Sequence, residues 1–283
     1  MQISWGVNAL KLCNQMNIHQ NKINRSIQRL SSGLRINSAA DDPAGLAISE
    51  RMKAQIRGLE VAKRNAEDGV SMLQTADGQL QGVQNILQRL NELSVQSANG
   101  TYSEFDRAAM SEEFNQLLDT IGGIGNNSEF NTIPLFKDKD GSGSNKFHIQ
   151  VGANAGQAIE IDTGVMNVGN LGLNGVNINT PEEAEKAMTA VKNAIDKVSI
   201  QRGKIGAYEN RLEYTIDNID NYSENLTSAL SRIIDVDMAK ESMEYAKNSM
   251  LLEVTQALMV QVRKQEEGMV DLLKSMMDSN NRR

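Results

Sequence analysis

The sequence contains few of the residues that cross-link a chain or fill a compact aromatic core. Its 283 residues include one cysteine, three prolines and two histidines, and aromatic residues make up 4%. A single cysteine excludes an internal disulfide, and we interpret Cys13 as a small apolar residue on a helix face rather than a reactive thiol. The scarcity of large rings favours long, thin helices with narrow seams, part of whose burial comes from other subunits.

The charge and hydropathy exclude two classes of partner. The net charge is −7 and the isoelectric point is near 5.1, whereas a nucleic-acid-binding surface needs clustered Lys and Arg. The sequence has no run of about 18 apolar residues, so we expect no membrane span. The N-terminal segment lacks the basic region and apolar run of a cleaved secretory signal. We therefore expect the chain to stay in the cytoplasm or to leave by a route that uses no such peptide.

The residue types needed for catalysis are present but not in catalytic arrangements. His19 and His148 lie far apart and have no companion at a zinc-binding spacing. The stretch "GSGSNK", residues 141–146, lacks the spacing of a phosphate-binding loop. No nucleophile elbow and no Cys–His pair occur. We expect no enzymatic activity, no cofactor and no metal.

Two heptad patterns predict long helices. One starts near Pro43 and runs to about Ser97, which makes a rod of roughly 80 Å at about 1.5 Å per residue. The other starts at "TPEE", where Thr180 is the expected N-cap and Pro181 the first helical residue, and ends near Asp235. Their apolar positions recur every seven residues, at Met52, Leu59, Ala66, Leu73, Leu80 and Leu87 in the first, and at Ala184, Val191, Val198, Ile205, Leu212, Ile219, Leu226 and Ile233 in the second.

Weaker patterns fill the rest of the chain. A third helix is expected to start at Ser103, with Asp106 completing its capping box, and to stop at Gly122–Gly125. Residues 126–179 are rich in glycine and alternate in "KFHIQVG" and "AIEID", which predicts one or two β-hairpins. Residues 7–31 and 238–276 are amphipathic, and we expect these two ends of the chain to pair.

These patterns predict a mainly α fold. It is an elongated antiparallel bundle or coiled coil of long helices, with a small β-hairpin region and paired terminal helices. We divide the chain into an N-terminal helix (1–40), N-terminal rod helices with the hairpins (41–179), a C-terminal rod helix (180–236) and a C-terminal helix (237–283).

The stretch "RLSSGLRINSAADDPAGLAISERM", Arg29 to Met52, interrupts the helical pattern. A phosphate cradle, a metal pair or a catalytic turn would each place Gly and Asp close together. A joint between two helices accounts for the same residues, because Gly33 suits a helix end while Asp42 and Pro43 suit a helix start. Neighbouring Asp41 and Asp42 point apart on a turn, which favours the joint over a carboxylate pair.

The same stretch, with others, resembles the bacterial flagellins. The most specific matches are "RLSSGLRINSAADDPAGLAIS" (29–49) and "RNAEDGVSMLQTADGQL" (64–80). The resemblance continues through "LQRLNELSVQSANGT" (87–101), "EFN" (129–131) and "LSRIIDVDMAKE" (230–241). Together these segments span well over half of the chain.

This resemblance implies a filament subunit without enzymatic activity. Such a subunit is exported unfolded by the flagellar type III apparatus, assisted by an export chaperone and a cap protein, and polymerises outside the cell. Its rods form an outer tube and its terminal helices an inner tube. Only about 17 residues, Thr163 to Asn179, are available for a variable domain, so the chain resembles a core-only flagellin. The joint between the tubes would comprise Gly33, Asp42, Pro43, Gly45, Asp235 and Asp237.

The resemblance also implies recognition by the flagellin-sensing Toll-like receptor of animal hosts. The matching positions are Arg89, Leu93 and Gln96 on the long helix and Glu113 on the next. Trp5, Cys13 and the tail after "VDLL" (270–273) depart from the family pattern. A minor flagellin, a hook–filament junction protein and a secreted immune-signalling ligand are the alternatives.

Overall fold

A computed structural model describes residues 2–137 and 145–280. Within these residues no helix combines the length and the apolar character that crossing a bilayer requires. The chain divides into two compact units, one formed by Met1–Lys53 with Leu226–Arg283 and the other by Ala54–Asn225. Each unit is described separately below, as the terminal unit and the rod unit.

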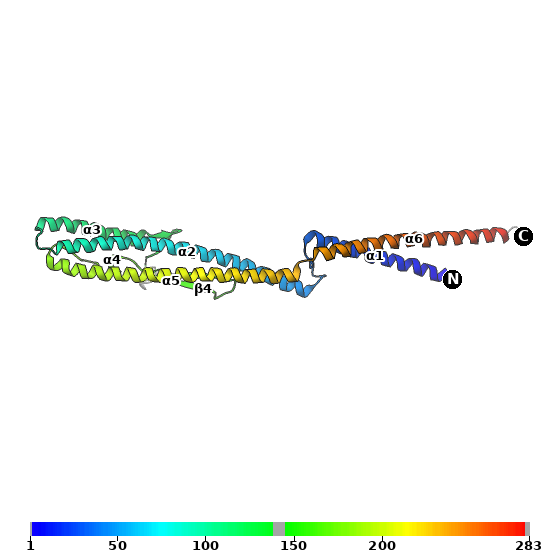
Figure 1. Cartoon of the computed structure of the whole chain (residues 1–283), viewed down its shortest axis with the longest axis horizontal. Coiled ribbons are helices and arrows are strands. Elements are labelled where there is room, and N and C mark those ends of the chain that lie inside the picture. Colours follow the sequence, from blue (N-terminus) through cyan, green and yellow to red (C-terminus); the bar gives the residue numbers. More distant parts are fainter. Residues whose placement is uncertain (1, 138–144, 281–283) are drawn as a thin grey trace. The chain divides into compact units, whose positions relative to one another are not determined.

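Long helices dominate both units, with two small hairpins in the rod unit (Figure 1). The expected mainly α fold with a β-hairpin region and paired terminal helices is confirmed. The helices are α1 (Gln2–Ser32), α2 (Pro43–Ser97), α3 (Glu104–Asn127), α4 (Val168–Leu171), α5 (Pro181–Ile234) and α6 (Met238–Asn280). The strands are β1 (Glu129–Phe130), β2 (Ile133–Pro134), β3 (Lys146–Gln150) and β4 (Ala158–Asp162).

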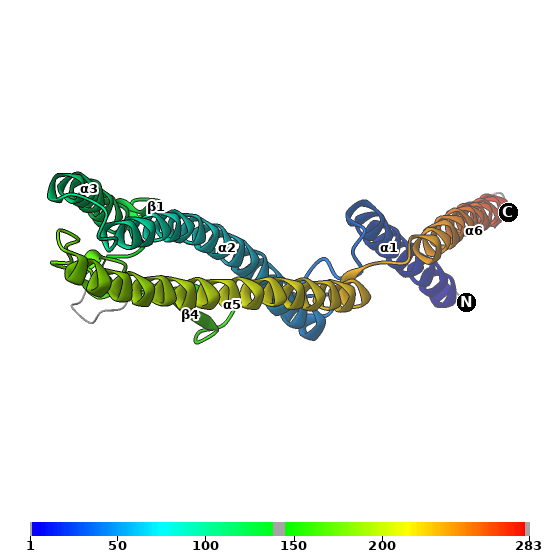
Figure 2. The same ribbon diagram turned by 60° about the vertical axis from the view of Figure 1, so that its left-hand side comes forward.

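In the rod unit, α2 and α5 lie side by side and antiparallel (Figure 2). The direction follows from their ion pairs, because Lys63 early in α2 meets Asp220 late in α5, at 2.7 Å. The predicted heptad seams meet in one core, which also takes in Phe114 and Ile121 of α3. Fully buried seam residues are Ala66, Leu73, Ala76, Leu80, Leu87 and Leu90 on α2, and Ala184, Val191, Val198, Ile205 and Leu212 on α5.

An ion pair between Arg202 of α5 and Asp77 of α2 interrupts the largely apolar seam. The guanidinium of Arg202 on α5 donates to the carboxylate of Asp77 at 2.8 and 3.0 Å, and to the Gln84 amide oxygen at 2.7 Å. The hydrogen bond to Asp77 raises the pKa of Arg202. A single polar residue at a seam position fixes the register of two helices, because any other alignment leaves the charge without its partner.

The third helix extends further than predicted. It begins at Ser103 with the expected capping box, but it continues through Gly122–Gly125, a stretch with three glycines, to Asn127 instead of stopping there. A Cβ at Gly125 would lie 1.9 Å from the carbonyl oxygen of Met166, so this glycine permits close backbone packing and does not end the helix. The prediction of the helix end was therefore wrong.

The two hairpins lie where the glycine-rich region was predicted. β1 pairs with β2 through a two-residue turn in which Asn131 and Thr132 both have positive φ. β3 pairs with β4, and Ile159 and Ile161 face the core. After β4, the segment Thr163 to Asn179 folds onto the rod unit through Leu171, Leu173 and Ile178. It therefore contributes to the core instead of forming a separate domain.

Two phenylalanines of the rod unit allow the stability contributed by its core to be tested. The Phe114 side chain is 0% exposed and the Phe105 side chain is 84% exposed, although both belong to α3. Phe114→Ala is expected to lower the free energy of unfolding by about 3–5 kcal/mol, and Phe105→Ala by less than about 0.5 kcal/mol. Denaturant unfolding followed by circular dichroism measures both, and equal losses would contradict the core assignment.

Candidate functional sites

The end of α1 is set by a glycine in the left-handed region. Gly33 has φ +70°, and its N–H donates to the carbonyl of Arg29 at 2.8 Å. No heavy atom lies within 4 Å of a Cβ placed there, so the backbone angle and not space is what requires glycine. Ser32 supports the turn, since its Oγ accepts from the Leu34 N–H at 3.1 Å.

The loop after this turn is ordered by one carboxylate. Asp41 accepts hydrogen bonds from the Ser38 hydroxyl, the Ser38 N–H and the Asn37 N–H, at 3.1 to 3.3 Å. Partial burial raises the pKa of Asp41, but these bonds and the Arg29 charge outweigh it, so the pKa lies below the ordinary 3.8. The contribution of this carboxylate to the loop is therefore complete above pH 3.8 and is lost as the pH falls through the lowered pKa.

The start of α2 combines a cap with close packing. Asp42 Oδ1 accepts from the N–H groups of Ala44 and Gly45 at 3.1 and 2.9 Å, and Pro43 is the first helical residue. A Cβ at Gly45 would lie 2.5 Å from Asp42 Oδ2 and 2.8 Å from Cδ1 of the buried Ile36. Gly45 therefore allows the cap and the apolar contact to exist together.

The chain passes this point again between α5 and α6. Leu34 and Asp235 form an antiparallel bridge, in which Val236 N–H donates to the Gly33 carbonyl at 3.0 Å and Arg35 N–H donates to the Ile234 carbonyl at 2.6 Å. Asp237 then caps α6 through the N–H groups of Ala239 and Lys240. The structure thus brings Gly33 next to the segment that contains Asp235, about 200 positions later in the sequence, whereas the contacts given for Asp42 and Gly45 lie within their own loop and the start of α2.

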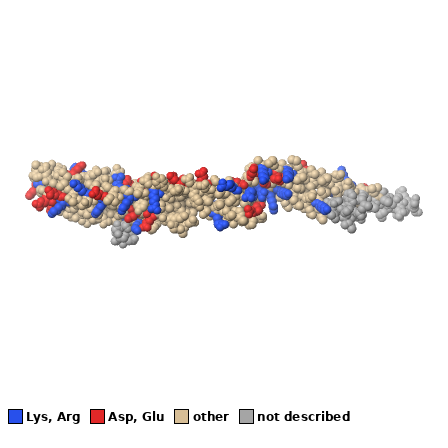
Figure 3. All heavy atoms as spheres, turned by 60° about the horizontal axis from the view of Figure 1, so that its bottom comes forward, with Lys and Arg blue, Asp and Glu red and all other residues tan. Residues whose placement is uncertain are grey.

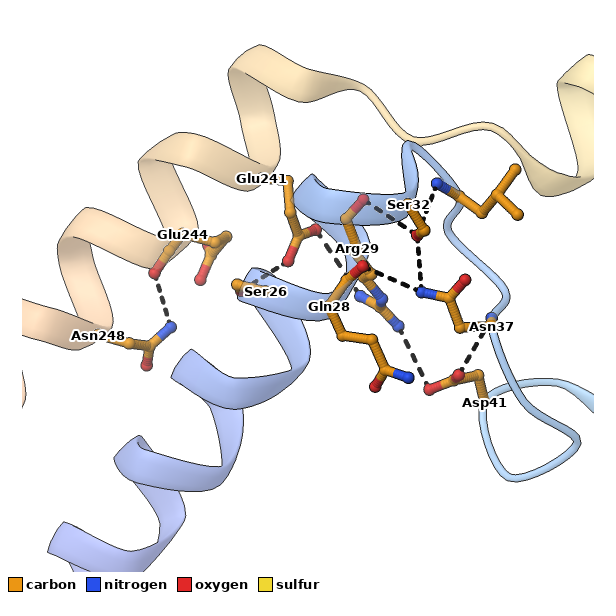
Figure 4. A network of polar contacts seen from close by, with 10 residues as sticks. Ser26, Gln28, Arg29, Ser32, Asn37, Asp41, Glu241, Glu244 and Asn248 are labelled. Atoms are coloured by element: carbon orange, nitrogen blue, oxygen red, sulfur yellow. Dashed lines mark hydrogen bonds and ion pairs between the residues drawn. The ribbon is translucent and has the colours of Figure 1, made fainter.

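Polar side chains connect α1 with α6 next to the bridge (Figure 4). Ser26 Oγ donates to Glu241 Oε1 at 2.6 Å, and the Arg29 guanidinium lies 3.7 Å from Glu241 and 3.9 Å from Asp41. Further along, His19 Nδ1 lies 3.2 Å from Asn248 Oδ1. Sequence periodicity did not reveal these contacts, because the residues that make them are polar.

Apolar residues of α6 also lie on its exposed side. Asn248 and Thr255, which lie toward α1, are 4% and 7% exposed. Met243, Met250, Val254 and Leu258 recur at spacings of seven and four and form a stripe, of which the first three residues are turned away from Asn248 and Leu258 lies to one side. Their exposed fractions are 66, 64, 53 and 44%. Within one chain this stripe, hereafter the outer stripe, has no covering element among the described residues.

The four residues matched to receptor binding do not share one environment. Arg89 is exposed, and its Nε donates to Glu113 at 2.9 Å while its Nη1 donates to Glu92 at 3.2 Å. These hydrogen bonds raise the pKa of Arg89. Gln96 is also exposed and donates to the Tyr102 hydroxyl at 3.1 Å. Leu93 differs, because its side chain is 1% exposed and packs in the rod core.

Other sequence candidates have structural surroundings without catalytic features. Cys13 is a half-buried free thiol. His148 lies on β3, opposite Glu160. Most of the glycine-rich stretch 141–146 lies outside the described residues. Among the residues that the structure does describe, no group of His, Cys, Asp and Glu is arranged to hold a metal ion.

The backbone at Gly33 generates a prediction for the joint. Gly33→Val is expected to destabilise the turn by about 1–2 kcal/mol, because a β-branched residue disfavours positive φ, whereas Gly33→Asn should cost less. Amide hydrogen exchange at Val236, whose N–H bonds to the Gly33 carbonyl, measures the effect. Equal exchange rates in the valine and asparagine variants would contradict the role assigned to this angle.

Comparison with known proteins identifies the family. The bacterial flagellin N-terminal helical region matches residues 3–140, and the C-terminal helical region matches residues 188–273. A flagellin of Halalkalibacterium halodurans is 44% identical, with 97% of this chain and 100% of that relative covered. The flagellar filament 33 kDa core protein of Treponema phagedenis is 41% identical, with 89% and 92% covered.

The likeness extends to a solved structure. A putative flagellar hook-associated protein from Vibrio parahaemolyticus has a TM-score of 0.58 at 16% identity, with 69% of this chain and 100% of that chain covered. This similarity shows a shared fold and no more. The matched regions and the relatives lead to one conclusion: the chain belongs to the bacterial flagellins, structural proteins of the flagellar filament and not enzymes.

Proposed function

We propose that the chain leaves the cell unfolded through the flagellar type III apparatus and polymerises outside it through its terminal helices. The outer stripe is the observation that supports this assembly mode. α6 carries apolar residues on two sides, since Leu252, Met259 and Val262 are half-buried on the side of Asn248, whereas the outer stripe is exposed to solvent. Neighbouring subunits would remove this apolar surface from water at about 25 cal/mol per Å².

The joint fits the same proposal. It separates the terminal helices, residues 1–40 and 237–283, from the rod segments, residues 41–179 and 180–236. In the proposed filament the first pair forms the inner tube and the second the outer tube. An export chaperone and a cap protein are the partners that this mode requires, because a stripe of exposed apolar residues associates prematurely unless it is covered.

Hydrogen exchange in two states tests the assembly mode. Residues 9–31 and 240–272 are expected to exchange rapidly in dilute monomer and slowly in the polymer, because isolated amphipathic helices need partners to stay formed. The buried seam of α2 and α5 serves as the internal control, since it should be protected in both states. Equal protection of the terminal helices in monomer and polymer would contradict the proposal.

Electron microscopy distinguishes the main filament subunit from its relatives. The proposal requires long uniform filaments after seeding with sheared filaments. Growth that stops at short lengths would instead identify a junction protein or a minor flagellin. A variant that lacks residues 274–283 shows whether the tail takes part in growth.

A second proposed function is binding to the flagellin-sensing Toll-like receptor. It is favoured by the exposed Arg89, which two carboxylates hold in one orientation and which Gln96 follows two turns later. A fixed guanidinium with an exposed face is suited to an interface anchor. Leu93 would support these residues from inside the rod core and would not touch the receptor.

A receptor reporter assay tests this second function. Arg89→Ala is expected to reduce signalling at least tenfold, while Arg211→Ala, a change at another exposed arginine of the rod unit, should leave it unchanged. Circular dichroism confirms that both variants remain folded. Equal signalling by the two variants would exclude Arg89 as a receptor contact.

A further inference from the structure

The terminal unit contains a groove with an unusual distribution of charge. The helix α1 carries Lys11, Lys22, Arg25 and Arg29 and has no acidic residue. Lys22, Arg25 and Arg29 follow at spacings of three and four, so they share a face. With Lys240 of α6 they line a groove of about 610 Å³ beside the Leu34–Asp235 bridge.

The acidic residues that line this groove already have partners within the chain. Asp237 caps α6, and Glu241 accepts from Ser26 and pairs with Arg29. Asp235 accepts from the Ser231 hydroxyl, and Glu244 pairs with Lys247 at 3.4 Å. Each carboxylate in the groove is thus engaged in a contact that the chain itself provides.

Three cations of the groove remain without such contacts. In residues 2–137 and 145–280, Lys22, Arg25 and Lys240 form no ion pair, and all three are exposed. Figure 3 shows Lys and Arg side chains gathered together with Asp and Glu side chains where α1 and α6 meet. The groove lining carries five cationic and four anionic side chains, and the three cations without an ion pair, Lys22, Arg25 and Lys240, are available to carboxylates from outside the chain.

The rod unit carries a group of carboxylates at the end where α3 and α5 begin. Glu104 lies in the first turn of α3, and Glu182, Glu183 and Glu185 lie at the start of α5. The end of α2 adjoins the segment before α5, since the Ser97 hydroxyl donates to the Ile178 carbonyl at 2.5 Å. Acidic side chains gather at this end in Figure 3. None of the four carboxylates forms an ion pair within the described ranges.

An exposed aromatic residue occupies the same end. Phe105 is 84% exposed, whereas the other four phenylalanines are buried or half-buried. The turn that holds it is rigid, because Arg107 donates to the carbonyls of Ser97, Asn99 and Tyr102 at 2.7 to 3.0 Å. An exposed aromatic side chain on an ordered turn, next to carboxylates such as Glu104 and Asp106, is suited to act as an interface anchor.

We propose that the basic groove of one copy receives the acidic end of a second copy. Lys22, Arg25 and Lys240 pair with Glu104, Glu182 and Glu185, and Phe105 packs at the centre of the contact. This inference rests on the proposed self-assembly and names two of its contact surfaces. Because the surfaces differ, the contact is heterologous, and every added copy presents a new groove or a new acidic end.

Charge reversal on each side tests the contact. The groove variant combines Lys22→Glu with Arg25→Glu, and the end variant combines Glu182→Lys with Glu185→Lys. Each is expected to raise the critical concentration for polymerisation about tenfold, because like charges then face one another. A chain that carries all four substitutions should return to within about threefold of the wild type, since opposite charges meet again.

Two controls make the outcome specific. Glu213→Lys with Glu224→Lys changes the charge as much as the end variant does, at exposed positions of α5 outside the acidic end, and should leave the critical concentration within about twofold of the wild type. Circular dichroism and thermal unfolding of each monomer establish that the variants fold. The effect of reversal should also shrink as the salt concentration rises.

The possible failures are distinguishable. If the wild-type chain forms no filaments, the proposed function fails together with this contact. If the wild type polymerises and both reversal variants do so equally well, the contact is overturned while self-assembly stands. If both variants are impaired and the fourfold variant shows no recovery, the two surfaces do not meet and the contact is again overturned.

Discussion

The terminal unit depends on a short antiparallel bridge between two passages of the chain. Two backbone hydrogen bonds join Gly33 and Arg35 to Val236 and Ile234. They satisfy groups that the ends of α1 and α5 would otherwise leave open, and they fix the point from which α6 starts. The positive φ of Gly33, the Asp42 cap and the Asp237 cap all serve to bring these passages together. A stretch that could have been a catalytic turn is therefore a structural joint.

The division of polar and apolar residues explains why a single copy of this chain is incomplete. In the rod unit, α2 and α5 bury their apolar seams against each other, and α3 and the hairpins close the core. In the terminal unit, α1 and α6 meet through polar contacts of Ser26, Glu241, His19 and Asn248, and the buried Ile23 lies on the same face of α1. Hydrogen bonds of this kind contribute only about 1 kcal/mol each and leave the outer stripe in water. Membership of the flagellins accounts for the exposed outer stripe, because a filament subunit functions in contact with neighbouring copies.

Much of the fold could be predicted from the sequence because heptad spacing and helix caps are local signals. Leu73, Leu80 and Leu87 showed the seam, and Thr180 with Pro181 showed the start of α5. The end of α3 could not be predicted, since the role of Gly125 depends on Met166, which lies 41 positions away in the numbering. α4 was missed for a similar reason, as a four-residue helix has no periodicity to detect.

Only some of the residues and contacts at the joint could be predicted from the sequence. Gly33 and Asp42 could be recognised because turns and caps need particular residue types, whereas Asp237 was predicted as part of the joint but not as a cap. The side-chain contacts between α1 and α6 could not, because Ser26 and Glu241 are 215 positions apart and neither belongs to an apolar pattern. Leu93 shows the opposite limit, since a motif match gives a position but does not show whether its side chain is exposed.

The contact between Arg202 and Asp77 bears on how α5 is aligned along α2. Sliding α5 by one heptad along α2 would move Arg202 away from Asp77, to face either Gln84 alone or Val70. Both positions leave a partly buried charge without its carboxylate, and this opposes displacement along the seam. The leucines of the seam are nearly interchangeable from one heptad to the next and would oppose it much less. The ion pair therefore favours one alignment of α5 along α2 over alignments displaced by a heptad, which the repeated leucines alone distinguish less well.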